Sequence, residues 1–240
     1  MSKTLGIIGG MGPLATCNLF EKIIKLTEAD CDQDHLNILI YNNATIPDRT
    51  EYILGVGENP NIHLIESAKK LENSGVDFLV MPCNTAHYFY NDIEKEINIP
   101  LLSMIEETAK YINNRYAIHK IGLLSTEGTI KSKIYDDAFS IYDIEVIKPT
   151  NEKQHIITKL IHDIKAGSID VDINAFQTVL DELTNKGVEY FILGCTEIST
   201  AYSIHNFEGK FIDPLELIAV RAIKFANKKV NQNYLKTIEG

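Results

Sequence analysis

The chain has 240 residues, of which 45% are hydrophobic and 23% are charged, and its formal net charge is −10. This composition is typical of a soluble globular protein with enough apolar residues for one large core or two smaller ones. The negative charge argues against nucleic acid and anionic membranes as partners, because neither polyanion would be attracted to the surface on average.

The first residues and the cysteines indicate the compartment. The opening MSKTLGIIGG lacks the apolar stretch and cleavage site of a signal peptide, and no apolar run reaches transmembrane length. We therefore expect a cytoplasmic protein. Cys17, Cys31, Cys83 and Cys195 form no CxxC pair and no cluster with metal-ligand spacing. In a reducing cytosol they are expected to be free thiols, and no metal site is predicted.

Apolar strand segments alternate with segments of helical periodicity along the whole chain. The predicted strands lie near residues 4–9, 36–42, 78–82, 120–124, 144–147, 190–194 and 211–213. The predicted helices lie near residues 13–29, 61–74, 84–97, 104–114, 129–140, 152–165, 172–186 and 214–230. Alternation of this kind predicts an α/β fold with mostly parallel sheets covered by helices.

The chain contains one pattern written twice. GVDFLVMPC at 75–83 matches GVEYFILGC at 187–195, and LGIIGGMG at 5–12 parallels IGLLSTEG at 121–128. The duplication predicts two pseudo-symmetric, Rossmann-like lobes with a cleft between them. We place the first lobe at residues 1–98 and the second at 99–210, with the helix at 214–230 packing back on the first.

Each copy of the pattern ends in a cysteine at the carboxyl end of a strand, where open α/β sheets bind their ligands. A helix N-terminus there is expected to lower the pKa of each thiol. A single cysteine in such a place is more often a small buried hydrophobe. The duplication favours a functional pair, Cys83 and Cys195.

Two opposed thiols suit one reaction in particular. A thiolate removes a proton from a carbon acid, and a thiol returns a proton to the opposite face, which inverts the carbon. With each sulfur in a near-attack position, the two would lie roughly 7 Å apart.

Four segments carry a resemblance to a known family: GIIGGMGPLAT at 6–16, IPDRT at 46–50, MPCNTAH at 81–87 and LGCTEIS at 193–199. They resemble the aspartate/glutamate racemase family, and the residues around both cysteines resemble its aspartate racemase branch. The resemblance implies two Rossmann-like lobes, an active site between them, no pyridoxal phosphate or metal, and a homodimer.

The same resemblance implies roles for individual residues. Cys83 and Cys195 match the catalytic acid/base pair, and Arg49 and Lys165 match the groups that bind a side-chain carboxylate. The remaining positions that match substrate-contacting residues are Met11, Gly12, Asn84, Thr85 and Thr196. Helix capping is an equally good explanation of Asn84 and Thr85, a last-turn helix lysine explains Lys165, and Arg49 could be solvated on a surface loop.

Further candidates come from position along the chain. Thr126 and Thr129 fall on the second-half counterpart of the glycine turn and could line the cleft. His87, one helical turn after Cys83, and Glu197, two residues after Cys195, are candidate auxiliary acids or bases. For His87 a packing role is at least as good an explanation. The long segment at 43–60 is expected to close over the site and to bring Arg49 with it.

The glycine turn also satisfies a dinucleotide-binding pattern, since Gly10, Gly12 and Ala15 match G-x-G-x-x-A. The second strand, however, ends in Tyr41-Asn42-Asn43, where that motif requires an acidic residue for the ribose. We therefore expect the amides of this turn to bind a carboxylate.

The sequence predicts a cofactor-independent racemase of a small acidic amino acid, most specifically aspartate. The second cysteine is followed by Thr-Glu and not by the Thr-His of glutamate racemases, which favours aspartate or a broader range of amino acids. Racemisation of glutamate remains an alternative. A two-lobed protein that binds an acidic amino acid without turning it over is another.

Overall fold

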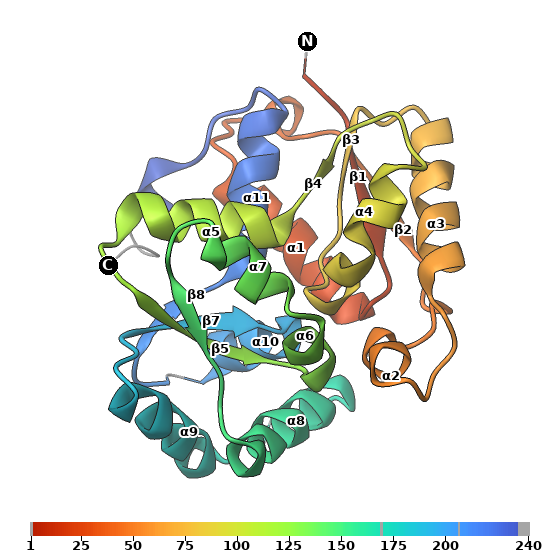
Figure 1. Cartoon of the computed structure of the whole chain (residues 1–240). Helices are drawn as coiled ribbons and strands as arrows, with labels where there is room; N and C mark the ends of the chain where they lie inside the picture. Colours follow the sequence, from red (N-terminus) through yellow and green to blue (C-terminus); the bar gives the residue numbers. More distant parts are fainter. Residues whose placement is uncertain (1, 169, 206, 235–240) are drawn as a thin grey trace.

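The strands of the computed structural model, which describes residues 2–168, 170–205 and 207–234, form two parallel sheets (Figure 1). The first sheet has the order β2-β1-β3-β4 and the second β6-β5-β7-β8. The strands are β1 (Leu5–Gly9), β2 (Ile38–Asn42), β3 (Phe78–Val80), β4 (Leu101–Leu102), β5 (Lys120–Ser125), β6 (Glu145–Ile147), β7 (Tyr190–Gly194) and β8 (Lys210–Ile212). The predicted α/β fold is confirmed.

Helices cover both faces of each sheet (Figure 1). Around the first sheet, α1 (Pro13–Leu26) and α11 (Pro214–Phe225) pack on one face, and α3 (Asn61–Asn73) and α4 (Tyr90–Glu94) pack on the other. Around the second sheet, α8 (Asn151–Lys165), α9 (Ile173–Asn185) and α10 (Thr196–Ile204) face α5 (Met104–Arg115) and α7 (Ile134–Ser140) across the strands. Because both faces are buried, the strands are nearly continuous apolar runs and do not alternate with polar residues.

The duplication extends to the packing inside each half. A Cβ atom on Gly6 in β1 would lie 2.6 Å from the Leu79 side chain. At the corresponding place in β5, a Cβ atom on Gly122 would lie 2.8 Å from Phe191. Glycine at both positions therefore lets a large side chain of the neighbouring strand lie against the backbone.

Two predicted helices are broken in the structure. Residues 84–97 form the 3₁₀ helix η2 (Thr85–Phe89) followed by the short α4. Residues 129–140 are divided between α6 (Glu127–Ser132) and α7, because Lys133 adopts a left-handed conformation with φ of 58°. Helical periodicity continues through both breaks, so neither change of direction was predictable from the apolar pattern.

The segment at 43–60 contains a helix that the prediction treated as a loop. Helix α2 (Arg49–Leu54) begins at Asp48, whose side chain accepts a hydrogen bond from the Glu51 amide at 3.0 Å, and ends at Gly55. It contacts α6 of the second half so closely that a Cβ atom on Gly128 would lie 2.8 Å from Thr50 Cα. The segment therefore does close against the second half, as a helix.

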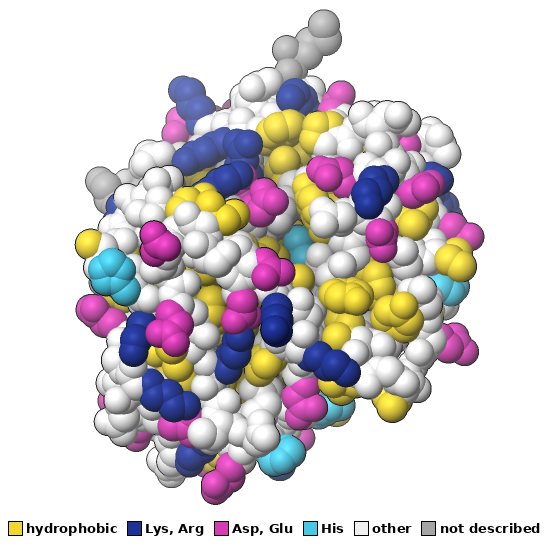
Figure 2. Space-filling view, in the orientation of Figure 1, with side chains coloured by type: hydrophobic (Ala, Val, Ile, Leu, Met, Phe, Trp, Pro, Cys, Tyr) yellow, Lys and Arg dark blue, Asp and Glu magenta, His cyan; other side chains and the backbone are white. Residues whose placement is uncertain are grey.

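On the face drawn in Figure 2, acidic and basic side chains are interspersed over both halves. Among the helices that the structure describes, none combines the length and the apolar composition needed to cross a membrane.

Candidate active site

The two cysteines occupy corresponding places in the two halves. Cys83 lies just beyond β3, and Cys195 follows β7 directly and caps the start of α10. Strands β3 and β7 are each third in the order of their sheets. Both cysteines are buried, and both line the same small pocket. Its other lining residues are Met11, Asp48, Arg49, Thr50, Asn84, Thr85, Thr126, Lys165, Thr196 and Glu197.

This pocket is nearly closed. Its volume is about 20 Å³, which is room for about one water molecule. A second cavity of about 340 Å³ adjoins it and shares Arg49, Lys165, Thr196 and Glu197 with it. Gly12, which does not line the pocket of the cysteines, lines this second cavity.

A carboxylate accompanies the second thiol. Cys195 Sγ donates a hydrogen bond of 2.8 Å to Glu197 Oε2, which also accepts one of 3.2 Å from the Thr196 hydroxyl. Burial, the negative charge of Glu197 and this hydrogen bond raise the pKa of the Cys195 thiol well above its usual range. The predicted lowering of its pKa by the helix N-terminus is therefore wrong for Cys195, because desolvation and the adjacent carboxylate outweigh the helix dipole.

Arg49 is 8% exposed, at the start of α2. One guanidinium nitrogen, Nη1, donates to the main-chain oxygens of Ile46 and Pro47 at 3.4 and 3.0 Å. The buried Nε has no hydrogen-bond partner among the described residues. An unpaired buried N–H is costly, so this side of the guanidinium is suited to an anionic ligand.

Lys165, at the end of α8, reaches the pocket from the second half. Its Nζ lies 4.0 Å from Asp48 Oδ2, next to Arg49 in the first half. The positive charge of Lys165 acts on Cys195 in the direction opposite to that of Glu197, but it has the smaller effect on the thiol pKa.

Asn84 and three threonines tie the two halves together around Cys83. The Tyr135 hydroxyl on α7 donates a hydrogen bond of 2.6 Å to Asn84 Oδ1. Thr85 Oγ1 lies 3.0 Å from Thr126 Oγ1 and 2.9 Å from Thr129 Oγ1. Thr129 thus supports the site through Thr85 and does not line the pocket itself.

His87 does not fit the predicted role of acid or base. Its Nδ1 lies 2.8 Å from the Cys83 carbonyl oxygen, and its Nε2 accepts a hydrogen bond of 3.0 Å from the Met104 amide. Burial lowers the pKa of His87 to about 4. A neutral imidazole with both nitrogens bonded to the main chain holds the backbone after Cys83 in place and has no free nitrogen to exchange a proton with the thiol.

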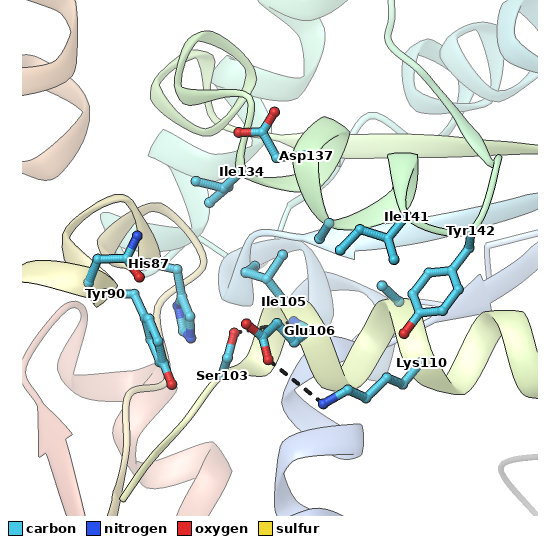
Figure 3. Close-up of a pocket in the computed structure, with 13 residues that line it drawn as sticks. His87, Tyr90, Ser103, Ile105, Glu106, Lys110, Ile134, Asp137, Ile141 and Tyr142 are labelled. Carbon is cyan, nitrogen blue, oxygen red and sulfur yellow. Dashed lines mark hydrogen bonds and ion pairs between the residues drawn. The ribbon is translucent and has the colours of Figure 1, made fainter. Parts of the chain in front are cut away.

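A larger cavity lies outside the site, on the side of His87 that faces α5. It measures about 440 Å³, and Figure 3 shows His87 and Tyr90 on one side of it and Ile141 and Tyr142 on the other. The cysteines do not line it. Within the described residues, no group of three or more His, Cys, Asp or Glu side chains is arranged to hold a metal ion.

Sequence reasoning missed three residues of the site. Asp48 and Thr50 flank Arg49 in the IPDRT segment, so their position was visible, but only the arginine was singled out. Tyr135 follows the threonines of the second half in a predicted helix and carries no sequence signal for contact with Asn84.

Comparison with known proteins identifies the family of the chain. The family model for Asp/Glu/Hydantoin racemase matches residues 8–222. The broad specificity amino-acid racemase RacX of Bacillus subtilis is 32% identical, over 90% of this chain and 94% of RacX.

Solved structures give the same result. The aspartate racemase of Picrophilus torridus superposes with a TM-score of 0.84 at 34% identity, over 97% of each chain. The glutamate racemase of Francisella tularensis, in complex with D-glutamate, has a TM-score of 0.68 at 18% identity, over 94% of this chain and 82% of that one, and shares the fold. The extent of these matches shows that the chain belongs to the Asp/Glu/hydantoin racemase family.

Proposed function

We propose that this protein interconverts L- and D-aspartate, with Cys83 and Cys195 as two proton-transferring thiols and without pyridoxal phosphate. The observation that carries the proposal is the pocket itself, because equivalent strands of the two halves each bring one cysteine to it. The similarity to the Picrophilus torridus aspartate racemase supports aspartate as substrate.

The chemistry follows from the different surroundings of the two thiols. Cys195 is protonated in this arrangement, since its Sγ donates to Glu197. Cys83, as thiolate, takes the α-proton, so the Cα–H bond breaks and an S–H bond forms. Cys195 then gives its proton to the opposite face of Cα, and its S–H bond breaks. The product is the mirror image of the substrate, and the protonation states of the two sulfurs are exchanged.

The enzyme must restore its protonation states before it turns over the same enantiomer again. Glu197 accepts from both Cys195 and Thr196 and also lines the adjoining cavity. In our proposal, Cys83 gives its new proton to solvent water, and Glu197 passes a proton from solvent to the Cys195 thiolate. Glu197 is then an auxiliary proton carrier that does not itself contact Cα.

The polar residues divide between the two carboxylates of aspartate. Arg49, with its unpaired Nε, and Lys165 bind the side-chain carboxylate. Asn84, Thr85, Thr196 and the amides of Met11 and Gly12 bind the α-carboxylate and stabilise the charge that spreads into it on proton removal. Every one of these residues lines the pocket or the adjoining cavity.

Substrate entry requires the pocket to open. A space of about 20 Å³ does not hold an amino acid. Helix α2 carries Arg49 and is bridged to the second half by Asp48 and Lys165, so its displacement opens the pocket and its return expels water. Cytoplasmic location and a homodimer remain part of the proposal.

A racemase with a broader range of amino acids is the second candidate. It is favoured by the similarity to RacX of Bacillus subtilis and by the adjoining cavity of about 340 Å³, which offers room for larger side chains.

The first prediction concerns the thiols. Cys83→Ser and Cys195→Ser each lower aspartate racemisation roughly 10²- to 10⁴-fold, because a hydroxyl is a far poorer base at neutral pH. Chiral chromatography of L- and of D-aspartate incubated with each variant measures this. Cys17→Ser, at an exposed cysteine, is the matched control and keeps wild-type activity. Near-wild-type turnover in either site variant would contradict the two-thiol mechanism. If the wild-type protein binds aspartate but does not turn it over, the result favours a binding protein.

The second prediction separates aspartate specificity from a broad range. Arg49→Gln lowers kcat/KM for aspartate roughly 100-fold, mainly through KM, because a buried charged partner of the side-chain carboxylate is lost. Asparagine has the same shape without the charge, so its kcat/KM changes little. The aspartate-to-asparagine ratio of kcat/KM is the readout, and Arg221→Gln, at a partly exposed arginine, is the control. An equal loss for both substrates contradicts the assignment of Arg49.

The third prediction concerns the pKa of Cys195. Glu197→Gln removes a negative charge that raises this pKa, so the thiol ionises at lower pH than in the wild type. Titration of thiolate ultraviolet absorbance in a Cys83→Ser background measures the shift, after subtraction of the Cys83→Ser/Cys195→Ser protein. Glu127→Gln, which does not line the cysteine pocket, leaves the titration unchanged. If the pKa of the Cys195 thiol is unchanged or higher in Glu197→Gln, the effect assigned to Glu197 is contradicted.

A further inference from the structure

One hydrogen bond joins the site to the core of the second half. Tyr135 on α7 is completely buried, and its hydroxyl donates to Asn84 Oδ1 at 2.6 Å. Asn84, which is 3% exposed, immediately follows Cys83 in the first half. The bond therefore crosses from one half to the residue beside a catalytic thiol.

The bond orients the amide of Asn84. A side-chain amide has a carbonyl oxygen on one side and two N–H groups on the other. Because the tyrosine hydroxyl occupies Oδ1, the NH₂ group is the end that is left for the pocket. Among the described residues, the structure gives this NH₂ group no hydrogen-bond partner.

The hydroxyl is a permanent donor in this setting. Burial, together with the negative charge of Asp213, raises the pKa of Tyr135 well above its usual range. The ring itself is held by packing, since it lies in the apolar cluster of α5, α7 and the second sheet, with the Phe139 ring 6.1 Å away between centroids. Packing of the Tyr135 ring therefore fixes the position of its hydroxyl group, and the hydroxyl group fixes the orientation of the Asn84 amide.

We propose that Tyr135 is a positioning residue for racemisation, which acts by holding the Asn84 NH₂ group toward the α-carboxylate of the substrate. This inference rests on the proposed function, since it names the ligand group that the amide meets. With the amide reversed, its carbonyl oxygen would face the carboxylate and repel the charge that develops there. Orientation of Asn84 thus decides whether it stabilises or opposes proton removal.

A double-mutant cycle tests the proposal. It compares wild type, Tyr135→Phe, Asn84→Ala and the double variant by kcat/KM for aspartate. Tyr135→Phe keeps the ring and is expected to lower kcat/KM roughly 10- to 100-fold, as loss of an orienting hydrogen bond does. If Tyr135 acts through Asn84, adding Tyr135→Phe to Asn84→Ala costs no more than about a further twofold.

The matched control removes the hydroxyl group of a different tyrosine, Tyr90, which bonds to the main chain and not to Asn84. Tyr90 donates to the Leu101 carbonyl oxygen at 2.7 Å and has no bond to Asn84. Tyr90→Phe is expected to keep wild-type kcat/KM, and thermal unfolding of all variants separates loss of fold from loss of orientation. If Asn84→Ala does not fold, Asn84→Ser takes its place in the cycle.

Calorimetric binding of succinate to the same proteins keeps the inference testable without turnover. Succinate carries two carboxylates and no exchangeable chiral centre. The wild type could bind succinate without racemising aspartate, while the losses of succinate affinity in the four proteins are non-additive. That result overturns the proposed function and supports the positioning role. The positioning role is overturned if the losses multiply in the double variant, or if Tyr135→Phe keeps wild-type kinetics and binding. It is also overturned if the wild type neither binds succinate nor turns over aspartate.

Discussion

The racemase chemistry proposed for this protein depends on one constraint: a sulfur must lie on each face of a single carbon, in a pocket that excludes water. A duplicated fold is suited to this constraint, because equivalent strands of the two halves end at a shared boundary and each is followed by one cysteine that lines the same pocket. The relative position of the two halves, which we call their register, is then as important as the thiols, because it sets where the two sulfurs lie. The close approach of Thr50 to Gly128 and the contacts of Thr85 with Thr126 and Thr129 supply that register.

The charges of the pocket are arranged to give the two thiols different states. Glu197 holds Cys195 protonated, while Arg49 and Lys165 supply positive charge on the side where a dicarboxylate would lie. A buried carboxylate beside a thiol opposes ionisation, so the proposed mechanism makes Cys195 the acid when Cys83 is the base. In the proposed mechanism, exchange of these roles on reaction with the other enantiomer moves a proton through Glu197, which lines both the pocket and the adjoining cavity.

Much of the fold was predictable because parallel strands buried on both faces are read directly as apolar runs, and the repeat fixed which strands correspond. The placing of Cys83 and Cys195 at strand ends followed from the same pattern. Helix α2 has local signals in Asp48 at its start and Gly55 at its end, but its 6 residues are too few to show helical periodicity. The left-handed turn at Lys133 has no sequence signal, because lysine rarely adopts a positive φ. The hydrogen-bond partners of Tyr135 and His87 were not predictable, because they depend on which atoms lie opposite the side chains. The pKa of Cys195 was predicted in the wrong direction, since burial and Glu197 outweigh the helix terminus.

The central claim, two thiols acting on opposite faces of one carbon, is tested most directly by proton NMR of the wild-type protein in D₂O at early reaction times. L-Aspartate is the substrate, and the α-position of both enantiomers is followed separately after chiral resolution. Two bases place solvent deuterium in the D-aspartate formed while the remaining L-aspartate keeps its α-proton, and the reverse reaction gives the mirror result. Deuterium entering the recovered substrate as fast as the product would mean that a single base serves both faces, and the paired role of Cys83 and Cys195 would be wrong.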